Sequence, residues 1–160
     1  MEQFFTPWRY EYVTRRKDGC ACVLCDVAAT PVDDDASAFV IHRGEAFFVV
    51  LNIYPYNTGH VMVVPYAHHS RLGDLQAESL GEMMELARRA ERLLTETYRP
   101  DGINLGMNLG RCSGAGIAEH LHLHVLPRWC GDTGFITITG GARVMPEELN
   151  ETWRKLHGRL

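Results

Sequence analysis

Three of the eight histidines in this chain stand at alternate positions within five residues, in the segment EHLHLHVLPR at residues 119–128. In an extended strand, side chains point alternately to the two faces, and neighbours on one face lie roughly 7 Å apart. The spacing therefore predicts that His120, His122 and His124 share one face of a strand. The apolar residues between them are predicted to face the core.

Two kinds of chemistry suit such a face. Neutral imidazole is a common metal ligand, and imidazole can also attack an electrophilic phosphorus atom. Gly114 and Gly116 precede the segment, and glycine lets backbone N–H groups approach an anion closely. The nearest acidic residue, Glu119, falls on the opposite face, which weakens a binuclear hydrolytic metal site. The sequence favours phosphorus chemistry and leaves metal ligation by the histidines as the alternative.

Cys22 and Cys25 form a second motif. A C-x-x-C pair in a reduced compartment is half of a zinc site, a redox pair, or simply two buried thiols. The chain has five cysteines, an odd number that argues against a disulfide framework. Its first ten residues do not resemble a secretion signal, and no stretch approaches the roughly 18 apolar residues of a membrane span. We therefore expect a cytoplasmic protein with reduced thiols and no membrane partner.

Length and charge restrict the organisation and the partners. With 160 residues, of which 46% are hydrophobic, the chain can bury one substantial core, which predicts a single domain over residues 1–160. The formal net charge is −4, so the chain lacks the basic surface with which proteins bind a phosphate backbone. Nucleic acid is therefore not an expected partner.

The elements that position the two motifs follow from the spacing of apolar residues. Two apolar runs separated by Arg43-Gly44-Glu45 predict a hairpin over about residues 39–51, and GHVMVVPY and DGINLGMN predict further strands. Apolar residues recur at helical spacing over 76–98, which predicts one long helix that ends at Pro100. Pro146 is expected in the first turn of a C-terminal helix. The predicted fold class is α+β, an antiparallel sheet with one long helix and a C-terminal helix. The apolar positions of the long helix are Leu80, Met83, Met84, Ala87, Ala90, Leu93, Leu94 and Tyr98.

Three segments occur together and in order: LNIYPYNTGHVMVVPYAHHS, GMNLGRCSGAG and the histidine segment. In this the chain resembles the histidine-triad (HIT) superfamily of nucleotide hydrolases and transferases. GAGIAEHLHLHVLPRWCGDTGF is most similar to the bacterial branch that includes diadenosine tetraphosphate phosphorylases. The resemblance covers about residues 22–146 and implies a HIT-like fold and an enzyme acting on dinucleoside polyphosphates or nucleoside phosphoramidates. Water, phosphate or another phosphate ester as acceptor would make it a hydrolase, a phosphorylase or a nucleotidyltransferase.

The resemblance also implies roles for individual histidines. The middle residue of the triad, His122, corresponds to the nucleophile that forms a nucleotidyl-histidine intermediate. His124 would donate a hydrogen bond to phosphate oxygens. His60, in TGHVMVV, matches a further family histidine near the triad, and an orienting role is implied for it.

Substrate-binding positions are implied in the same way. The turn Gly114-Ala115-Gly116 would offer backbone donors to phosphate, whereas many relatives carry Gln or Ser just before the triad. Asn52 stands where the family binds the ribose hydroxyls, usually with an acidic residue, and Asn108 aligns with an asparagine near the phosphates. The residues at nucleobase-pocket positions are Val23, Leu24, Leu51 and Ile53.

Several relatives complete a structural zinc site with two histidines, which here are His68 and His120. Together with Cys22 and Cys25 they make a set of two sulfur and two nitrogen ligands that suits tetrahedral zinc with no open position. The resemblance thus implies a structural zinc ion, the alternative being thiols without metal. No organic cofactor is expected.

Family members commonly form two-fold dimers through the long helix and an edge strand, so a homodimer is expected, and the apolar segment VVLNIYPY is a candidate for the contact. Two other functions stay open at this point. One is a metal-dependent hydrolase that uses the triad as ligands, and the other is a nucleotide-binding regulator without turnover.

Overall fold

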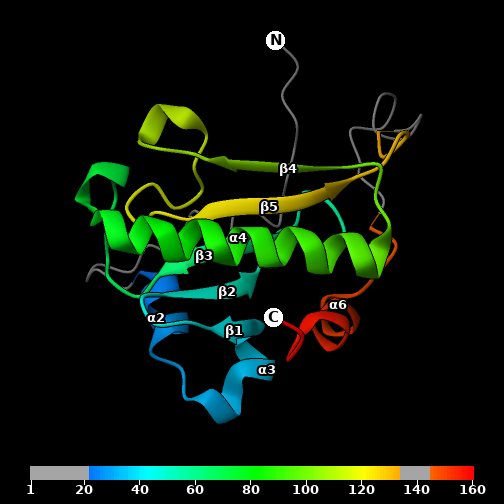
Figure 1. The fold of residues 1–160 in the computed structure, drawn as a ribbon, viewed down its shortest axis with the longest axis horizontal. Helices are drawn as coiled ribbons and strands as arrows, with labels where there is room; N and C mark the ends of the chain where they lie inside the picture. The colour runs from blue at the N-terminus through cyan, green and yellow to red at the C-terminus, as the bar shows by residue number, and fades with distance from the viewer. Residues whose placement is uncertain (1–21, 134–144) are drawn as a thin grey trace.

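A five-stranded antiparallel sheet with the order β1-β2-β3-β5-β4 organises the molecule (Figure 1). The computed structural model describes residues 22–133 and 145–160. The predicted hairpin is confirmed by β1 and β2, which pair antiparallel, and the next two predicted strands by β3 and β4. The strands are β1 (Val40–Arg43), β2 (Phe47–Leu51), β3 (Val61–Pro65), β4 (Gly102–Met107) and β5 (Leu123–Arg128).

Both faces of the central strands are covered, which is why β2 and β3 are continuous apolar runs and every residue in them is buried. Alternate residues of each strand enter one of two core clusters. Phe47 packs in the cluster that α4 covers, whereas the adjacent Phe48 packs on the other face with Leu24 of α2 (Val23–Ala28). The first three residues of the VVLNIYPY segment are buried in these two clusters, so they fill the core of this chain.

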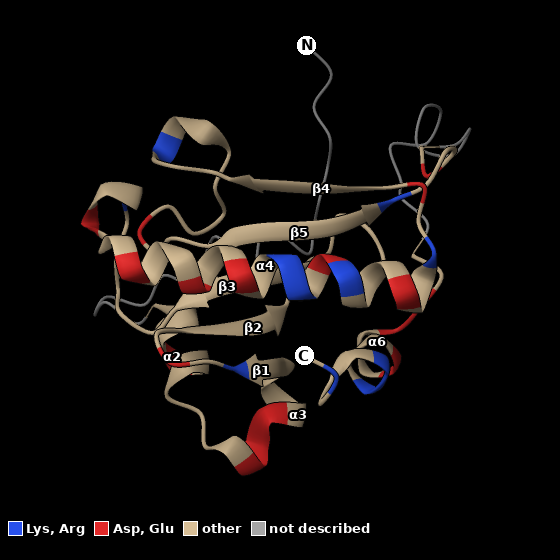
Figure 2. Cartoon of the chain, viewed as in Figure 1, with Lys and Arg blue, Asp and Glu red and all other residues tan. Residues whose placement is uncertain are grey.

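The long helix α4 (Ala77–Tyr98) lies across one face of the sheet and confirms the predicted long helix. Its charged residues are all acidic along the first half of the helix and of both signs along the second half (Figure 2). Met84, predicted to face the core, is 53% exposed, and the buried stripe instead includes Leu86. The helix ends at Tyr98. The next residue, Arg99, has a left-handed backbone and precedes Pro100, and proline disfavours the right-handed helical conformation at the residue before it. No helix of the described residues is long and apolar enough to cross a membrane.

The C-terminal helix α6 (Leu149–Leu156) begins later than predicted. Pro146 lies before the helix instead of in its first turn. The intervening Glu147 accepts hydrogen bonds from the Tyr98 hydroxyl at 2.7 Å and from the Thr152 hydroxyl at 2.7 Å. These contacts attach the segment before α6 to the end of α4, so the helical conformation starts only after them.

Short helices connect the sheet to the cysteine motif. The helix α2 follows Cys22 and includes Cys25, and η1 (Val32–Asp34) and α3 (Asp35–Ala38) lead from it into β1. Arg43 of β1 donates to the carbonyl oxygens of Ala28 at 3.2 Å and Thr30 at 2.9 Å, and to Asp35 Oδ1 at 2.7 Å. The end of α2 is thereby held against the first strand.

The histidine segment differs from the prediction in one respect. The strand β5 begins at Leu123, so His120 and His122 precede it and only His124 lies within it. Before the strand, the Leu121 N–H donates to the His69 carbonyl oxygen at 2.6 Å. Leu123 and Val125 pack under α4, as the alternation predicts.

Candidate active site and metal centre

His60 and His124 form a directed pair at the centre of the sheet. The Tyr56 backbone N–H donates to His60 Nδ1 at 3.1 Å, so a neutral His60 carries its proton on Nε2. His60 Nε2 lies 2.9 Å from His124 Nδ1 and therefore donates to it. His124 then carries its own proton on Nε2, a buried atom with no hydrogen-bond partner among the described residues. The arrangement leaves one N–H donor of His124 available to a bound anion.

His122 is the opposite tautomer to His124. Its Nδ1 lies 2.8 Å from the His120 carbonyl oxygen, which can only accept, so Nδ1 carries the proton. The lone pair of the neutral ring is consequently on Nε2. The rings of His122 and His124 meet edge to face with centroids 4.8 Å apart. A nucleophilic nitrogen and a hydrogen-bond donor therefore lie on adjacent imidazoles.

Burial keeps these imidazoles neutral. It lowers the pKa of His60 to about 3, aided by the nearby His124 and His122, and lowers the pKa of His124 to about 4, aided by His122. Burial also lowers the pKa of His122 below its ordinary value of 6.5, which the hydrogen bond to the His120 carbonyl partly opposes. A neutral His122 is the form that can attack phosphorus.

Asn52 lies directly after β2, beside the histidine pair. Its backbone N–H donates to the His60 carbonyl oxygen at 3.0 Å, and its side-chain Oδ1 accepts from the Tyr54 N–H at 2.9 Å. One oxygen lone pair of Asn52 is thus engaged in a local turn. Its amide N–H groups are the donors that it can offer to a hydroxyl pair.

The four predicted nucleobase-pocket residues are not brought together as one set. Val23 and Ile53 are 46% and 47% exposed, as residues that contact a ligand can be. Leu24 is buried in the cluster on the triad's side of the sheet, since His124 pairs with Met62 of that cluster. Leu51 packs in the cluster under α4, on the opposite face.

The predicted phosphate-binding turn precedes the triad in the chain. Gly114 and Gly116 are exposed, Ala115 is half-buried, and Gly114 has a φ of 86°, a left-handed conformation that glycine adopts without strain. Asn108 follows β4 and is half-buried. On β4, Gly106 pairs with His124 and has open space where a Cβ would project.

The four predicted metal ligands converge. Ligand atoms of Cys22, Cys25, His68 and His120 all lie within 4.8 Å of one another. Cys22 Sγ and Cys25 Sγ lie 3.2 and 3.5 Å from His120 Nδ1, and Cys25 Sγ lies 3.2 Å from His68 Nδ1. With bonds of about 2.3 Å to sulfur and about 2.0 Å to nitrogen, tetrahedral ligands are separated by about 3.3–3.8 Å. The group could hold a metal ion.

The tautomer of His120 fits that use. Its Nε2 lies 2.9 Å from the Pro65 carbonyl oxygen and donates to it, which leaves the Nδ1 lone pair directed at the two sulfurs. Burial, together with the neighbouring histidines, lowers the pKa of His120 and favours the neutral ring that a metal requires. The same residue thus joins two sites, since its ring belongs to the metal group and its carbonyl orients His122.

The backbone groups that contact these histidines could not be predicted from the sequence. The Tyr56 N–H and the Pro65 carbonyl select the tautomers of His60 and His120, but any residue type can supply such groups. The YPYN segment at residues 54–57 belongs to one of the family motifs, yet its role in orienting His60 becomes apparent only from the contact itself.

A five-stranded antiparallel sheet that presents alternate histidines at the start of an inner strand defines the histidine-triad class of α+β proteins. The chain belongs to the HIT family, whose HIT domain matches residues 34–130.

Among similar proteins is an "AP-4-A phosphorylase" of Mycobacterium tuberculosis, 42% identical over 98% of this chain and 83% of that protein. A "Bis(5'-adenosyl)-triphosphatase" of Dictyostelium discoideum is 32% identical over 52% of this chain and 56% of its own length. Among solved structures, a zinc-bound histidine triad family protein from Mycobacterium smegmatis has a TM-score of 0.68 and 29% identity, and the match covers 87% of this chain and 92% of that one.

Proposed function

We propose that this protein cleaves dinucleoside polyphosphates through a nucleotidyl intermediate on His122. The observation that carries the proposal is that the two adjacent imidazoles are opposite tautomers. Nε2 of His122 has a lone pair, whereas Nε2 of His124 carries a proton. The similar mycobacterial protein is named for phosphorolysis of diadenosine tetraphosphate and aligns with nearly the whole chain. A dinucleoside polyphosphate is accordingly the substrate class that we assign.

In the first step the His122 Nε2 lone pair attacks the α-phosphorus, and the bond from that phosphorus to its bridging oxygen breaks. The departing nucleotide takes the bridging oxygen with its electron pair. The His124 Nε2–H donates to a phosphate oxygen on which negative charge accumulates, and the glycine turn at 114–116 supplies backbone donors. In the second step an acceptor oxygen attacks the same phosphorus, the bond from phosphorus to Nε2 breaks, and free His122 is restored.

The acceptor decides the products, so one substrate distinguishes the reactions. Diadenosine tetraphosphate should give ATP and a protein-bound adenylyl group in the first step. Transfer to inorganic phosphate then gives ADP, whereas transfer to water gives AMP. We assign phosphorolysis because of the similarity to the mycobacterial protein. With phosphate present, nucleotide analysis should detect ADP and ATP in equal amounts, and AMP in place of ADP would make the protein a hydrolase.

The covalent step has its own test. Wild-type protein quenched in base during turnover should contain an adenylyl group on His122, which peptide mass spectrometry locates, because the phosphorus–nitrogen bond survives base and is hydrolysed in acid. His122→Asn should form no adduct and lose turnover while it still binds nucleotide, because only the nucleophilic lone pair is removed. An active His122→Asn protein would refute the covalent mechanism.

Two other functions have less support. A hydrolase with the triad as metal ligands would need His122 and His124 in the ligand set, but the metal group among the described residues includes only His120 of the three. A regulator without turnover would have no need of opposite tautomers at His122 and His124. Chelation that abolishes adduct formation at once, with the fold intact, would favour the first of these.

We also assign the metal group to structural zinc, because two thiolates and two imidazoles fill a tetrahedral shell and leave no open position. Bound zinc would fix the start of α2 against the segment before β5. His120 connects the metal group to the proposed nucleophile, since its carbonyl orients the His122 ring. Metal analysis should find about one zinc per chain. Absence of zinc in protein produced with zinc supplied would remove this assignment.

A homodimer is the last part of the proposal. The edge strand β4 carries the exposed Leu105, which faces the same side of the sheet as α4, and α4 carries the exposed Met84. An interface across this side would cover both residues. Light scattering at micromolar concentration should give twice the chain mass, and a monomer mass would exclude the dimer.

A further inference from the structure

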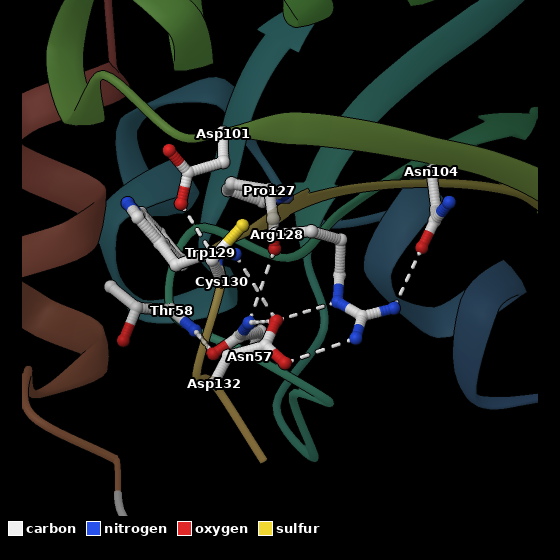
Figure 3. A network of polar contacts seen from close by, with 9 residues as sticks. All are labelled: Asn57, Thr58, Asp101, Asn104, Pro127, Arg128, Trp129, Cys130 and Asp132. Atoms are coloured by element: carbon white, nitrogen blue, oxygen red, sulfur yellow. Dashed lines mark hydrogen bonds and ion pairs between the residues drawn. The ribbon is translucent and has the colours of Figure 1, made fainter.

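A polar network joins the end of β5 to the loop before β3 (Figure 3). Its centre is Asp132, whose side chain is 8% exposed and whose two oxygens accept a fork of hydrogen bonds from Arg128 at 2.6 and 3.0 Å. Asp132 Oδ2 also accepts from the Trp129 N–H at 3.2 Å and from Asn57 Nδ2 at 2.9 Å. The other arm of Arg128 donates to Asn104 Oδ1 on β4 at 2.9 Å. A carboxylate surrounded by donors in this way holds a fixed orientation.

Asn57 transmits that orientation to the loop 52–60. Its Nδ2 group also donates to the Pro127 carbonyl oxygen at 3.2 Å, and its Oδ1 accepts from the Thr58 N–H at 3.2 Å. The Asn57 carbonyl oxygen accepts from the His60 N–H at 3.2 Å. Asn57 is buried, so the loop has no water-exposed alternative for these contacts.

The residue on each side of this anchor matters for the catalytic pair. Tyr56, immediately before Asn57, is the source of the backbone N–H that donates to His60 Nδ1. His60 lies three residues after Asn57 and donates through Nε2 to His124. A backbone N–H must stay within about 3.2 Å and nearly in line to remain a hydrogen bond, so a small rotation of the loop would free His60 Nδ1.

We infer that Asn57 and Asp132 are positioning residues for the reaction. They hold the loop 52–60 so that the Tyr56 N–H fixes the proton of His60 on Nε2, and this in turn fixes the proton of His124 on the nitrogen that faces the substrate. Neither residue touches the reacting atoms. Without the contact between them, His60 can carry its proton on Nδ1, and His124 then loses its donor partner and can present a lone pair to the phosphate.

Which ring nitrogen of each histidine is protonated can be measured without any substrate. Long-range proton–nitrogen NMR correlations of imidazole distinguish the Nδ1–H form from the Nε2–H form. In the wild-type protein His60 and His124 should both be Nε2–H at neutral pH. Asp132→Asn keeps the side-chain volume but places an amide where Asn57, Arg128 and Trp129 all donate. We expect His60 and His124 in this variant to give signals of mixed tautomers.

The kinetic arm rests on the proposed cleavage of dinucleoside polyphosphates. Asp132→Asn should lower kcat by about 10- to 100-fold, the range expected for a small displacement of catalytic groups. KM should change little, because Asp132 does not contact the substrate. If the wild-type protein cleaves none of these substrates, the proposed function fails, whereas the tautomer measurement still decides the inference.

Asp101 provides a matched control. Its Oδ2 accepts from the Cys130 N–H at 2.6 Å in the same turn, but among the residues drawn in Figure 3 it makes no hydrogen bond with the loop 52–60. Asp101→Asn should leave the tautomers of His60 and His124 and the value of kcat unchanged. An equal loss in this variant would mean that any damage to the turn suffices, and would overturn the inference.

A second variant approaches the contact from the other side. Asn57→Ser removes the donor to Asp132 and should give the same mixed tautomers and a similar loss of kcat. Because both substitutions remove one shared contact, the double variant should lose no more than the larger single loss. Multiplicative losses in the double variant, or wild-type tautomers in both single variants, would refute the role assigned to this pair.

Discussion

Acidification should destabilise the protein through two buried histidines of the candidate site. His60 and His124 are neutral in the folded state, with pKa values lowered by burial to about 3 and about 4, from an ordinary value of 6.5. Above pH 6.5 neither the folded nor the unfolded state binds these protons, so their contribution to stability is fully present. As the pH falls below that value, the unfolded chain binds protons that the folded protein excludes.

The size of the effect follows from proton linkage. Each of these histidines reduces the free energy of unfolding by about 1.4 kcal/mol per pH unit in the range between the two pKa values. Between about pH 7.5 and about pH 5.5 the net loss is about 1.4 kcal/mol for each histidine, because only the lower half of the interval lies below the unfolded pKa. The two residues together should therefore cost about 3 kcal/mol, and the loss should level off as the pH falls through the folded pKa values.

Urea unfolding at the two pH values measures this loss, and two variants divide it. His60→Gln keeps an amide that can accept from the Tyr56 N–H and donate to His124, but it does not titrate, so the loss should fall by about half. His157→Gln is the control, because His157 is exposed and should leave the loss unchanged. An unchanged loss in His60→Gln would refute the reasoning, since His60 would then not be the group that excludes the proton.

Three further changes test other parts of the structure. Cys25→Ser should release the zinc that we assign to this group and lower the melting temperature in calorimetry while turnover stays measurable, because that ion would hold structure and would not contact the substrate; complete loss of turnover with metal retained would contradict this. Arg43→Met should lower the free energy of unfolding in urea by about 3 kcal/mol, because it leaves the buried Asp35 carboxylate without its partner; a loss below about 1 kcal/mol, typical of exposed pairs, would contradict this. Gly59→Ala should cost about 1–3 kcal/mol by the same assay, because φ at this residue is 77° and the new Cβ would lie 3.0 Å from Pro127 Cγ; a neutral change would show that the loop can relax.

The sheet strands, the long helix, the histidine triad and the Cys/His group could all be predicted from the amino-acid sequence. Alternating apolar residues specify which face of a strand is buried, so Leu123 and Val125 could be assigned to the core from their spacing. The ligand set at Cys22, Cys25, His68 and His120 could be assembled by resemblance, since two short motifs supply all four residues. Strands and helices could be predicted because a local pattern of residues reflects local geometry. The Cys/His group could be predicted because it repeats a combination that relatives share.

The sequence was less informative at the ends of elements. The late start of α6 depends on Glu147, whose carboxylate accepts a hydrogen bond from the Tyr98 hydroxyl of a different helix, a contact that no local pattern encodes. The exposure of Met84 differs from the prediction for a related reason. An apolar stripe at helical spacing allows small rotations of the helix, and the packing of α4 on the sheet turned Leu86 inward and left Met84 exposed.

The protonation pattern of the site depends instead on contacts between segments that are distant in the sequence. The three triad histidines are equivalent in the sequence, yet His120 donates to the Pro65 carbonyl, His122 to the His120 carbonyl, and His124 accepts from His60. Which ring nitrogen keeps its lone pair therefore depends on backbone groups and side chains from other segments of the chain. A backbone N–H or carbonyl has the same chemistry at every position, so the place in space that the pairing of β3 with β5 gives it decides which nitrogen is protonated: Nε2 in His120 and His124, and Nδ1 in His122.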